Sequence, residues 1–365
     1  MRVDQTPVSR PASAPTAPAP ATSWIDFARV VAAAAVVIVH TISPLVSTAY
    51  ADLNTPPWWV ANVLDSALRW CVAVFVMLSG ALLLRPRDEN TGDFYRKRWA
   101  KIGVPLVVWT AGYLLWMRWR DDISLADAAG QAASGSPSIH LYFLYIIAGL
   151  YLFTPFLRTV VAHTSRSGLW WFVGVSLAVG VTDQILAMVD GAGGVTAVTQ
   201  FVPFLGFYML GYLLLHSEPN PRATRFGAVS FTVGVTVIAV GAWVATMVQG
   251  EWGTGGEYVY DFLSPPMVLA GVGAFLLLRA GGLRLAEATG PVAVRATKAV
   301  GALSGLSFGV YLVHVMVLNT LRDIGGTFEG TQALMAASGY AIATAAISLL
   351  LVAVAQRIPL LRATV

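Results

Sequence analysis

The sequence is poor in charged residues and contains a single cysteine. Asp, Glu, Lys and Arg make up 12% of its 365 residues, whereas soluble domains carry roughly 25%. With 56% hydrophobic residues and a mean hydropathy of +0.68, a fold surrounded only by water is excluded. The lone cysteine, Cys71, permits neither an internal disulfide nor a cysteine-based metal site, and its apolar neighbours in the sequence favour a buried, apolar role.

Several functional motifs are missing as well. The five histidines are scattered without metal-protease spacing, so we expect no bound metal. There is no glycine-rich phosphate loop and no nucleophile elbow. No basic stripe with interleaved aromatic residues is present, which excludes a nucleic-acid partner. His140, at the edge of an apolar run, and His163 and His216, beside loops, are expected to be solvated.

The sequence does contain a series of apolar runs close to the length that crosses a hydrocarbon core of roughly 30 Å. Backbone groups in lipid have to be satisfied within their own segment, which predicts helices. We therefore predict an all-α, polytopic membrane helix bundle over residues 24–357. It has about ten transmembrane helices, at 26–46, 60–84, 102–119, 139–157, 168–189, 199–215, 227–248, 262–280, 299–320 and 333–355.

The distribution of positive charge predicts the orientation of this bundle. With the N-terminus inside, 19 of the 23 Lys and Arg residues fall in inner segments and Arg69 lies within a span. The other 3 fall in outer loops, namely Arg118, Arg120 and Arg322. This bias follows the positive-inside rule and predicts a multi-pass protein of the cell membrane with both termini in the cytoplasm. Residues 1–23, rich in Pro, Ala, Ser and Thr, are expected to form a disordered cytoplasmic tail. Residues 358–365 are expected to form a short cytoplasmic tail.

Ionisable residues inside a span cost free energy, so each is a candidate functional group. The first span contains Asp26, Arg29 and His40. Arg29 and His40 are about three helical turns apart, so they share one helix face at a separation of about 16 Å along the axis. Taken singly, Arg29 can also be a snorkelling flank and His40 a core histidine. Their shared face favours the functional interpretation.

Arg69 and His314 form a second candidate group. Arg69 lies in the second span with Asp65 one turn before it, so an intrahelical ion pair is available, and such a pair can be purely structural. His314 lies in the ninth span and reaches a depth similar to that of His40 and Arg69. Two imidazoles and a guanidinium at one level predict a buried polar centre.

The segment 94–101 (FYRKRWAK) places four positive charges before the third span. One interpretation is a topology anchor in contact with lipid headgroups. The other is a dock for an anionic cytosolic cofactor, because Arg and Lys bind phosphate well.

Five segments resemble the membrane-bound acyltransferase-3 family, in the family's order, between residue 24 and about residue 320. WIDFARVVAAAAVVIVH is similar to its first helix, in which ten residues separate an Arg and a His, as they separate Arg29 and His40. RWCVAVFVMLSG, ending in Ser79 and Gly80, resembles the second helix, and FYRKRWAKIGVP resembles the start of the third. HLYFLYIIAGLYLFTPFLR resembles the fourth helix, and SFGVYLVHVMVL resembles a late helix that bears a histidine. The segments are most similar to the branch that O-acetylates surface polysaccharides.

This resemblance implies transfer of an acyl group, usually acetyl from acetyl-CoA, to a hydroxyl of a glycan or lipid-linked sugar. His40 would act as general base or acyl carrier, with Arg29 orienting the donor and Asp26 fixing Arg29. Substrate or oxyanion contacts would come from Arg69, His314 and Ser79, and CoA phosphates would be held by Arg96, Arg98 and Lys101.

The expected partners are therefore acyl-CoA, the glycan or lipid-linked acceptor and the lipid bilayer, without a permanently bound cofactor. A secondary transporter with a proton or substrate path through the buried Arg and His residues is the main alternative. The ordered motifs favour the enzyme.

Overall fold

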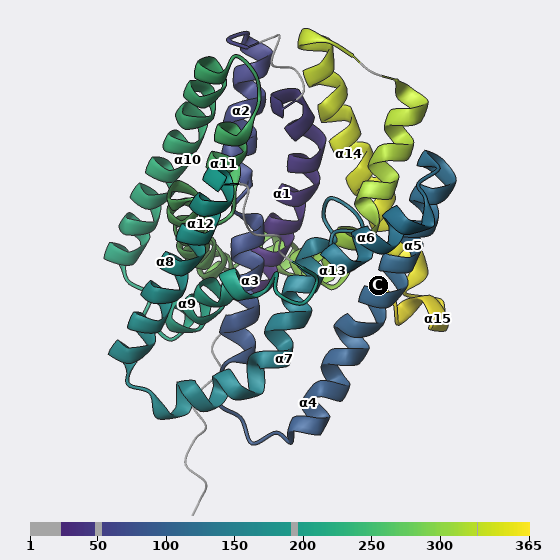
Figure 1. The fold of residues 1–365 in the computed structure, drawn as a ribbon. Helices are drawn as coiled ribbons and strands as arrows, with labels where there is room; N and C mark the ends of the chain where they lie inside the picture. The colour runs from purple at the N-terminus through teal and green to yellow at the C-terminus, as the bar shows by residue number, and fades with distance from the viewer. Residues whose placement is uncertain (1–22, 48–52, 191–195, 327) are drawn as a thin grey trace, which may run out of the picture.

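The computed structural model describes residues 23–47, 53–190, 196–326 and 328–365, and every regular element in these ranges is a helix (Figure 1). The all-α prediction is therefore confirmed. A shorter apolar helix, Val202–Leu215, occupies the sixth predicted span, and the tail predicted over residues 1–23 lies outside the described residues except for Ser23. Nine helical segments of the described chain are long and apolar enough to cross a membrane, namely Ser23–Ser47, Pro56–Leu83, Thr91–Asp121, Tyr142–His163, Arg166–Val189, Pro221–Gln249, Thr254–Glu287, Pro291–Gly325 and Gly330–Ala355.

The segments are built from individual helices, some of them interrupted. In chain order the elements are α1 (Ser23–Ser47), α2 (Pro56–Leu68), α3 (Cys71–Leu83), α4 (Thr91–Arg98), the π-helical turn η2 (Trp99–Gly103), α5 (Val104–Asp121), α6 (Leu125–Ser134), α7 (Tyr142–His163), α8 (Arg166–Asp190), the 3₁₀ turn η3 (Val202–Phe204), α9 (Leu205–Leu215), α10 (Pro221–Gln249), α11 (Thr254–Tyr260), α12 (Pro265–Glu287), α13 (Pro291–Gly325), α14 (Gly330–Ala355) and α15 (Pro359–Arg362).

Polar caps and prolines determine where several helices begin. Thr55 directly precedes Pro56, the first residue of α2, and its side chain accepts a hydrogen bond from the Trp58 amide. The Asn90 side chain accepts one from the Gly92 amide at the start of α4. Asn220 caps α10 in the same way, ahead of Pro221. Such caps satisfy amides that have no partner inside the helix, and proline in the first turn needs none.

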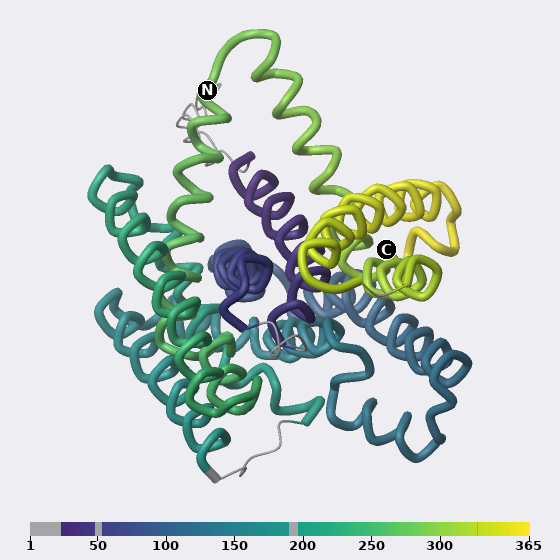
Figure 2. The backbone as a smooth tube through the Cα atoms, turned by 90° about the horizontal axis from the view of Figure 1, so that it is seen from above, coloured from purple at the N-terminus to yellow at the C-terminus, as the bar shows by residue number. Residues whose placement is uncertain are grey.

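Helix α1 lies in the middle of the bundle, between the α10–α12 side and the α13–α14 side (Figure 2). It contacts α2, α3, α12, α13 and α14. Beside it, α3 and α9 approach so closely that only glycine fits at two positions of their contact. A Cβ atom on Gly80 would lie 1.8 Å from the Tyr208 carbonyl oxygen, and one on Gly211 would lie 1.9 Å from the Met77 carbonyl oxygen. Small residues at such crossings let two membrane helices pack backbone against backbone.

The two ends of the bundle differ in charge. The end where α1 begins also holds α4 and the C-terminal end of α7, and we call it the basic end (Figure 1). Arg96, Lys97 and Arg98 lie there in the last turn of α4. Its placement on the cytoplasmic side stays a prediction from the sequence. The predicted tail over 358–365 contains α15, and the Thr364 carbonyl accepts a 2.7 Å hydrogen bond from the Trp109 indole of α5.

Candidate active site

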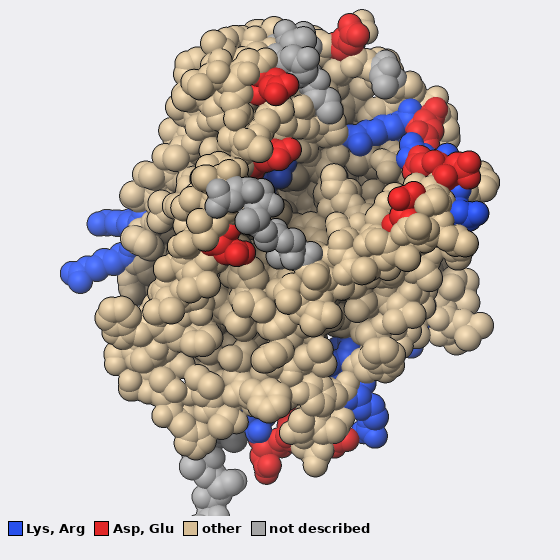
Figure 3. Space-filling model, viewed as in Figure 1, with Lys and Arg blue, Asp and Glu red and all other residues tan. Residues whose placement is uncertain are grey.

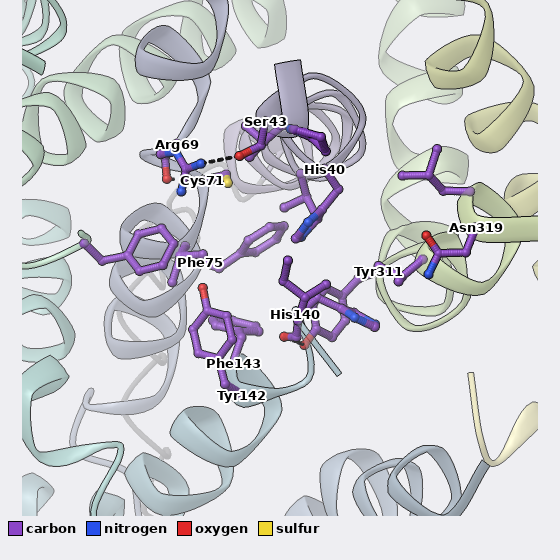
Figure 4. A pocket seen from close by; sticks show the side chains of 18 of the residues that line it. His40, Ser43, Arg69, Cys71, Phe75, His140, Tyr142, Phe143, Tyr311 and Asn319 are labelled. Atoms are coloured by element: carbon purple, nitrogen blue, oxygen red, sulfur yellow. Dashed lines mark hydrogen bonds between the residues drawn. The ribbon is translucent and has the colours of Figure 1, made fainter. Parts of the chain in front are cut away.

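A cavity of about 370 Å³, the histidine cavity, lies between α1, α3, the start of α7 and α13. Figure 4 shows His40, Arg69 and Phe75 directed toward this space, and the face in Figure 3 is hollowed in its upper half. Its polar lining residues are His40, Ser43, Ser47, Arg69, His140, Tyr142, Tyr311, Asn319 and Arg322. No Asp or Glu is among the described lining residues, so the cavity presents hydroxyls, imidazoles and guanidinium groups.

Three histidines from different parts of the chain cluster here: His40 and His140 line the cavity, and His314 is buried against them. The ring centroids of His40 and His314 are 5.2 Å apart, those of His140 and His314 are 4.9 Å apart, and those of His40 and His140 are 6.2 Å apart. His140 is 2% exposed, so the expectation that it is solvated was wrong, whereas His163 and His216 are exposed as predicted. His140 lies just before α7, in a turn that folds against α13 and so removes it from solvent.

The hydrogen bonds of two of these rings fix their tautomers. His314 Nδ1 lies 2.7 Å from the Tyr311 carbonyl oxygen, so Nδ1 carries the proton and Nε2 is left with a lone pair. His140 Nε2 lies 3.4 Å from the Leu312 carbonyl oxygen and Nδ1 lies 3.3 Å from the Ser138 hydroxyl, so Nε2 donates and Nδ1 accepts. Among the described residues no group is hydrogen-bonded to the His40 ring, which faces the cavity and is available to a ligand.

Arg69 is held rigidly in the wall of the same cavity. It lies at the junction of α2 and α3, where its Nε is 2.8 Å from Asp65 Oδ1 and its Nη2 donates to Ser43 at 2.6 Å. Its guanidinium also lies over the Tyr260 ring, 4.3 Å from the centroid. The 2.8 Å contact with Asp65, which is fully buried, confirms the ion pair expected from the sequence. A fixed cation thus faces the cavity that His40 lines, in agreement with the predicted polar centre.

A second cavity, of about 440 Å³, lies toward the basic end and we call it the Arg29 cavity. Arg29, Ser79 and Lys101 line it together with Ser304. Arg29 is 3.5 Å from Asp26, and the Ser304 hydroxyl donates to the same carboxylate at 2.8 Å. Ser79 therefore lies beside Arg29, not beside Arg69 and His314, with which the sequence analysis grouped it. Arg29 and His40 line two cavities that share Phe75, Phe143 and Tyr311, which agrees with the prediction that both side chains lie on one face of α1.

Three aromatic side chains, the aromatic partition, separate the two cavities. Phe75 of α3, Phe143 of α7 and Tyr311 of α13 are lining residues of both. The ring centroids of Phe75 and Phe143 are 5.8 Å apart, and those of Phe143 and Tyr311 are 5.5 Å apart. The two cavities are thus stacked along one set of helices, with the partition between them.

The basic segment before the third span is divided between two places. Lys101 lines the Arg29 cavity, whereas Arg96 and Arg98 line a separate groove of about 510 Å³ whose other walls are mostly apolar. Arg96 is paired with Asp93 at 3.0 Å, and the Arg98 guanidinium lies near the Tyr151 ring. The three predicted CoA-binding cations therefore do not share one cavity.

Glu89 joins this segment to the rest of the bundle. It accepts from Lys97 at 2.8 Å and from Arg158 of α7 at 3.1 Å, and Arg158 also donates to the Leu83 carbonyl at 2.7 Å. The bond from Lys97, aided by that from Arg158, holds the pKa of the Glu89 carboxyl below its usual value.

The residues of the histidine cavity that sequence reasoning missed include His140, Tyr311 and Arg322. His140 and Tyr311 lie in segments quoted for the family resemblance but carried no charge or depth signal of their own. Arg322 was assigned to an outer loop, yet it lies in the last turn of α13 and lines the cavity. In the described ranges no group of three or more His, Cys, Asp or Glu is arranged to hold a metal ion.

The chain was compared with known families, curated proteins and solved structures. The family model of the acyltransferase domain known as acyltransferase 3 matches residues 22–353, which include every site residue named above. No curated protein and no solved structure matches the chain significantly. With a family match over nearly its whole length and a helical bundle fit for a membrane, the chain belongs to the acyltransferase-3 family of membrane acyltransferases.

Proposed function

We propose that the protein transfers an acyl group, in the first place acetyl, from acyl-CoA to a hydroxyl of a surface glycan or lipid-linked sugar. The observation that carries this proposal is the pair of stacked cavities, one with Arg29 and Lys101, the other with His40. A donor from one side of a membrane and an acceptor from the other would meet at the aromatic partition between them.

The Arg29 cavity suits the donor. CoA is a polyanion, and both Arg29 and Lys101 are cations on the wall of this cavity. The cavity lies toward the basic end, the end that the charge bias predicts to be cytosolic. Ser304 donates to Asp26, which lies 3.5 Å from Arg29, and this acid would orient the Arg29 guanidinium toward the thioester arm of the donor.

The histidine cavity suits the acceptor. In the proposed reaction His40 takes the proton from the acceptor hydroxyl while the hydroxyl oxygen attacks the thioester carbonyl. The C–S bond then breaks, and the departing CoA sulfur takes the proton from the His40 imidazolium. A relay in which His40 first carries the acyl group would use the same ring.

Of the two oxyanion candidates on this side of the partition, Arg69 and His314, Arg69 is the better one. His314 directs its only N–H at the Tyr311 carbonyl, so its Nε2 lone pair would accept a proton but would not stabilise a negative charge. Arg69 keeps Nη1 without a partner among the described residues, and a fixed guanidinium is a strong stabiliser of developing charge.

Transport of a solute is the alternative use of such a bundle. A proton-coupled path would need polar groups from one end to the other. Phe75 and Phe143 interrupt the polar lining halfway, which favours a group transfer across the partition over passage of a solute.

Incubation of the purified protein with acetyl-labelled acetyl-CoA tests the proposal. We expect label in an extracted glycan or lipid-linked sugar, together with an equal amount of free CoA thiol. Release of thiol without labelled acceptor would show that the protein only hydrolyses the thioester, and would contradict the proposal. Movement of an unmodified solute across the membrane of liposomes would show that it is a transporter instead.

A further inference from the structure

A proline inside α1 leaves the backbone of His40 without its usual hydrogen bond. Pro44 lies within the helix, four residues after His40, and proline has no N–H to donate to the carbonyl at that distance. Within a membrane span, a protein donor can satisfy a carbonyl that the helix leaves free.

Arg322 supplies that donor from another helix. Its Nη2 lies 3.1 Å from the His40 carbonyl oxygen and 2.9 Å from that of Thr41. Arg322 forms no ion pair among the described residues, and the acid beside it, Asp323, is bound by Arg120 at 2.7 and 2.8 Å. The Arg322 guanidinium is thus directed at the helix that carries His40.

The same two helices are joined again near the basic end. The Ser304 hydroxyl of α13 donates to Asp26 of α1 at 2.8 Å. His40 stands at the Arg322 contact on α1, and His314 lies between the two contacts on α13, with its ring centroid 5.2 Å from that of His40. The contact of Arg322 therefore fixes the position of α1 along the axis of α13, and with it the position of the His40 ring relative to the His314 ring.

We propose that Arg322 is a positioning residue for His40, required because Pro44 removes the helical donor to the His40 carbonyl. This inference rests on the proposed function, in which His40 is the reacting base. A displacement of about 1 Å at a reacting group can cost about 100-fold in rate. Loss of Arg322 should act on turnover and leave donor affinity, set in the other cavity, nearly unchanged.

A double-mutant cycle tests this inference. In Arg322→Gln we expect kcat to fall about 100-fold with little change in the KM for acetyl-CoA. Pro44→Ala restores an amide at the helical position, so the double variant Pro44→Ala/Arg322→Gln should recover at least about tenfold of the lost kcat. Arg120→Gln, which breaks the neighbouring pair with Asp323, is the matched control and should keep near wild-type kcat.

Each variant is compared by kcat per folded protein, with thermal melting to measure the folded fraction. Equal kcat values for Arg322→Gln and the double variant, both folded, would overturn the positioning role. A loss in Arg322→Gln confined to melting temperature would reduce the residue to a structural one. An inactive wild-type protein would overturn the proposed function, and this role with it, before any variant is compared.

Discussion

At the scale of single residues, the site depends on side chains whose geometry is fixed by neighbours. Arg69 is held by Asp65, Ser43 and the Tyr260 ring, and Arg29 is held by Asp26. A guanidinium presents several donors in a rigid plane, whereas an ammonium is a compact charge on a flexible stem. The identity of these cations, and not only their charge, should therefore matter.

Arg29→Lys should lower kcat/KM for acetyl-CoA at least about tenfold, because the charge remains while the planar fork is lost. Steady-state kinetics at saturating acceptor measure the effect. Arg225→Lys is the matched control, because it makes the same substitution at an exposed position at the start of α10. Equal kinetics for the two variants would show that Arg29 is only a snorkelling flank.

At the scale of helices and their contacts, the aromatic partition separates the proposed donor side from the proposed acceptor side. Phe143 is its central member, since its ring lies near both Phe75 and Tyr311. Water that crosses the partition could attack the thioester in place of the acceptor, and a packed aromatic layer excludes it.

Phe143→Ala should therefore raise acetyl-CoA hydrolysis in the absence of acceptor, by about tenfold or more, while transfer falls. Thiol release with and without acceptor gives both rates. Phe153→Ala removes an aromatic ring from the same helix at a position 46% exposed on its outer face, and should change neither rate. Unchanged hydrolysis in a folded Phe143→Ala protein would contradict the barrier role.

The division of the basic segment between two cavities leads to a further prediction. Lys101→Gln should raise the KM for acetyl-CoA more than Arg96→Gln does, because only Lys101 lines the Arg29 cavity, whereas Arg96 lies in the apolar groove. Donor titrations of the two variants measure the difference. A larger effect of Arg96→Gln would place the CoA phosphates over the groove.

At the scale of the whole molecule, the proposed reaction needs a defined orientation in the membrane. We expect the basic end to face the cytoplasm, because 19 of 23 Lys and Arg residues fall on that side of the predicted topology. In a Cys71→Ala background, Asp88→Cys should resist an impermeant reagent added outside cells and Glu251→Cys should react with it. Both positions are exposed, so the reverse pattern would invert the orientation.

Much of this architecture could be predicted from the sequence, because the length of an apolar run is a local property. The face shared by Arg29 and His40 followed from helical periodicity alone, and the Asp65–Arg69 pair followed from a spacing of four residues. His140 could not be predicted, because its burial comes from the fold of a turn against α13, which is distant in the chain. The separation of Ser79 from Arg69 could have been predicted, because ten residues of helix place Ser79 about 15 Å further along the axis.

The most direct test of the central claim is the turnover of His40→Ala. His40 lines the histidine cavity, on the far side of the partition from the donor, and its ring is free to act on an acceptor. Its removal should therefore lower the rate of transfer by about 10² to 10⁴-fold. Acetyl-CoA binding and folding should be retained, and His163→Ala, which changes an exposed histidine, should leave turnover intact. A folded His40→Ala protein that transfers acetyl at a near wild-type rate would contradict the proposed mechanism.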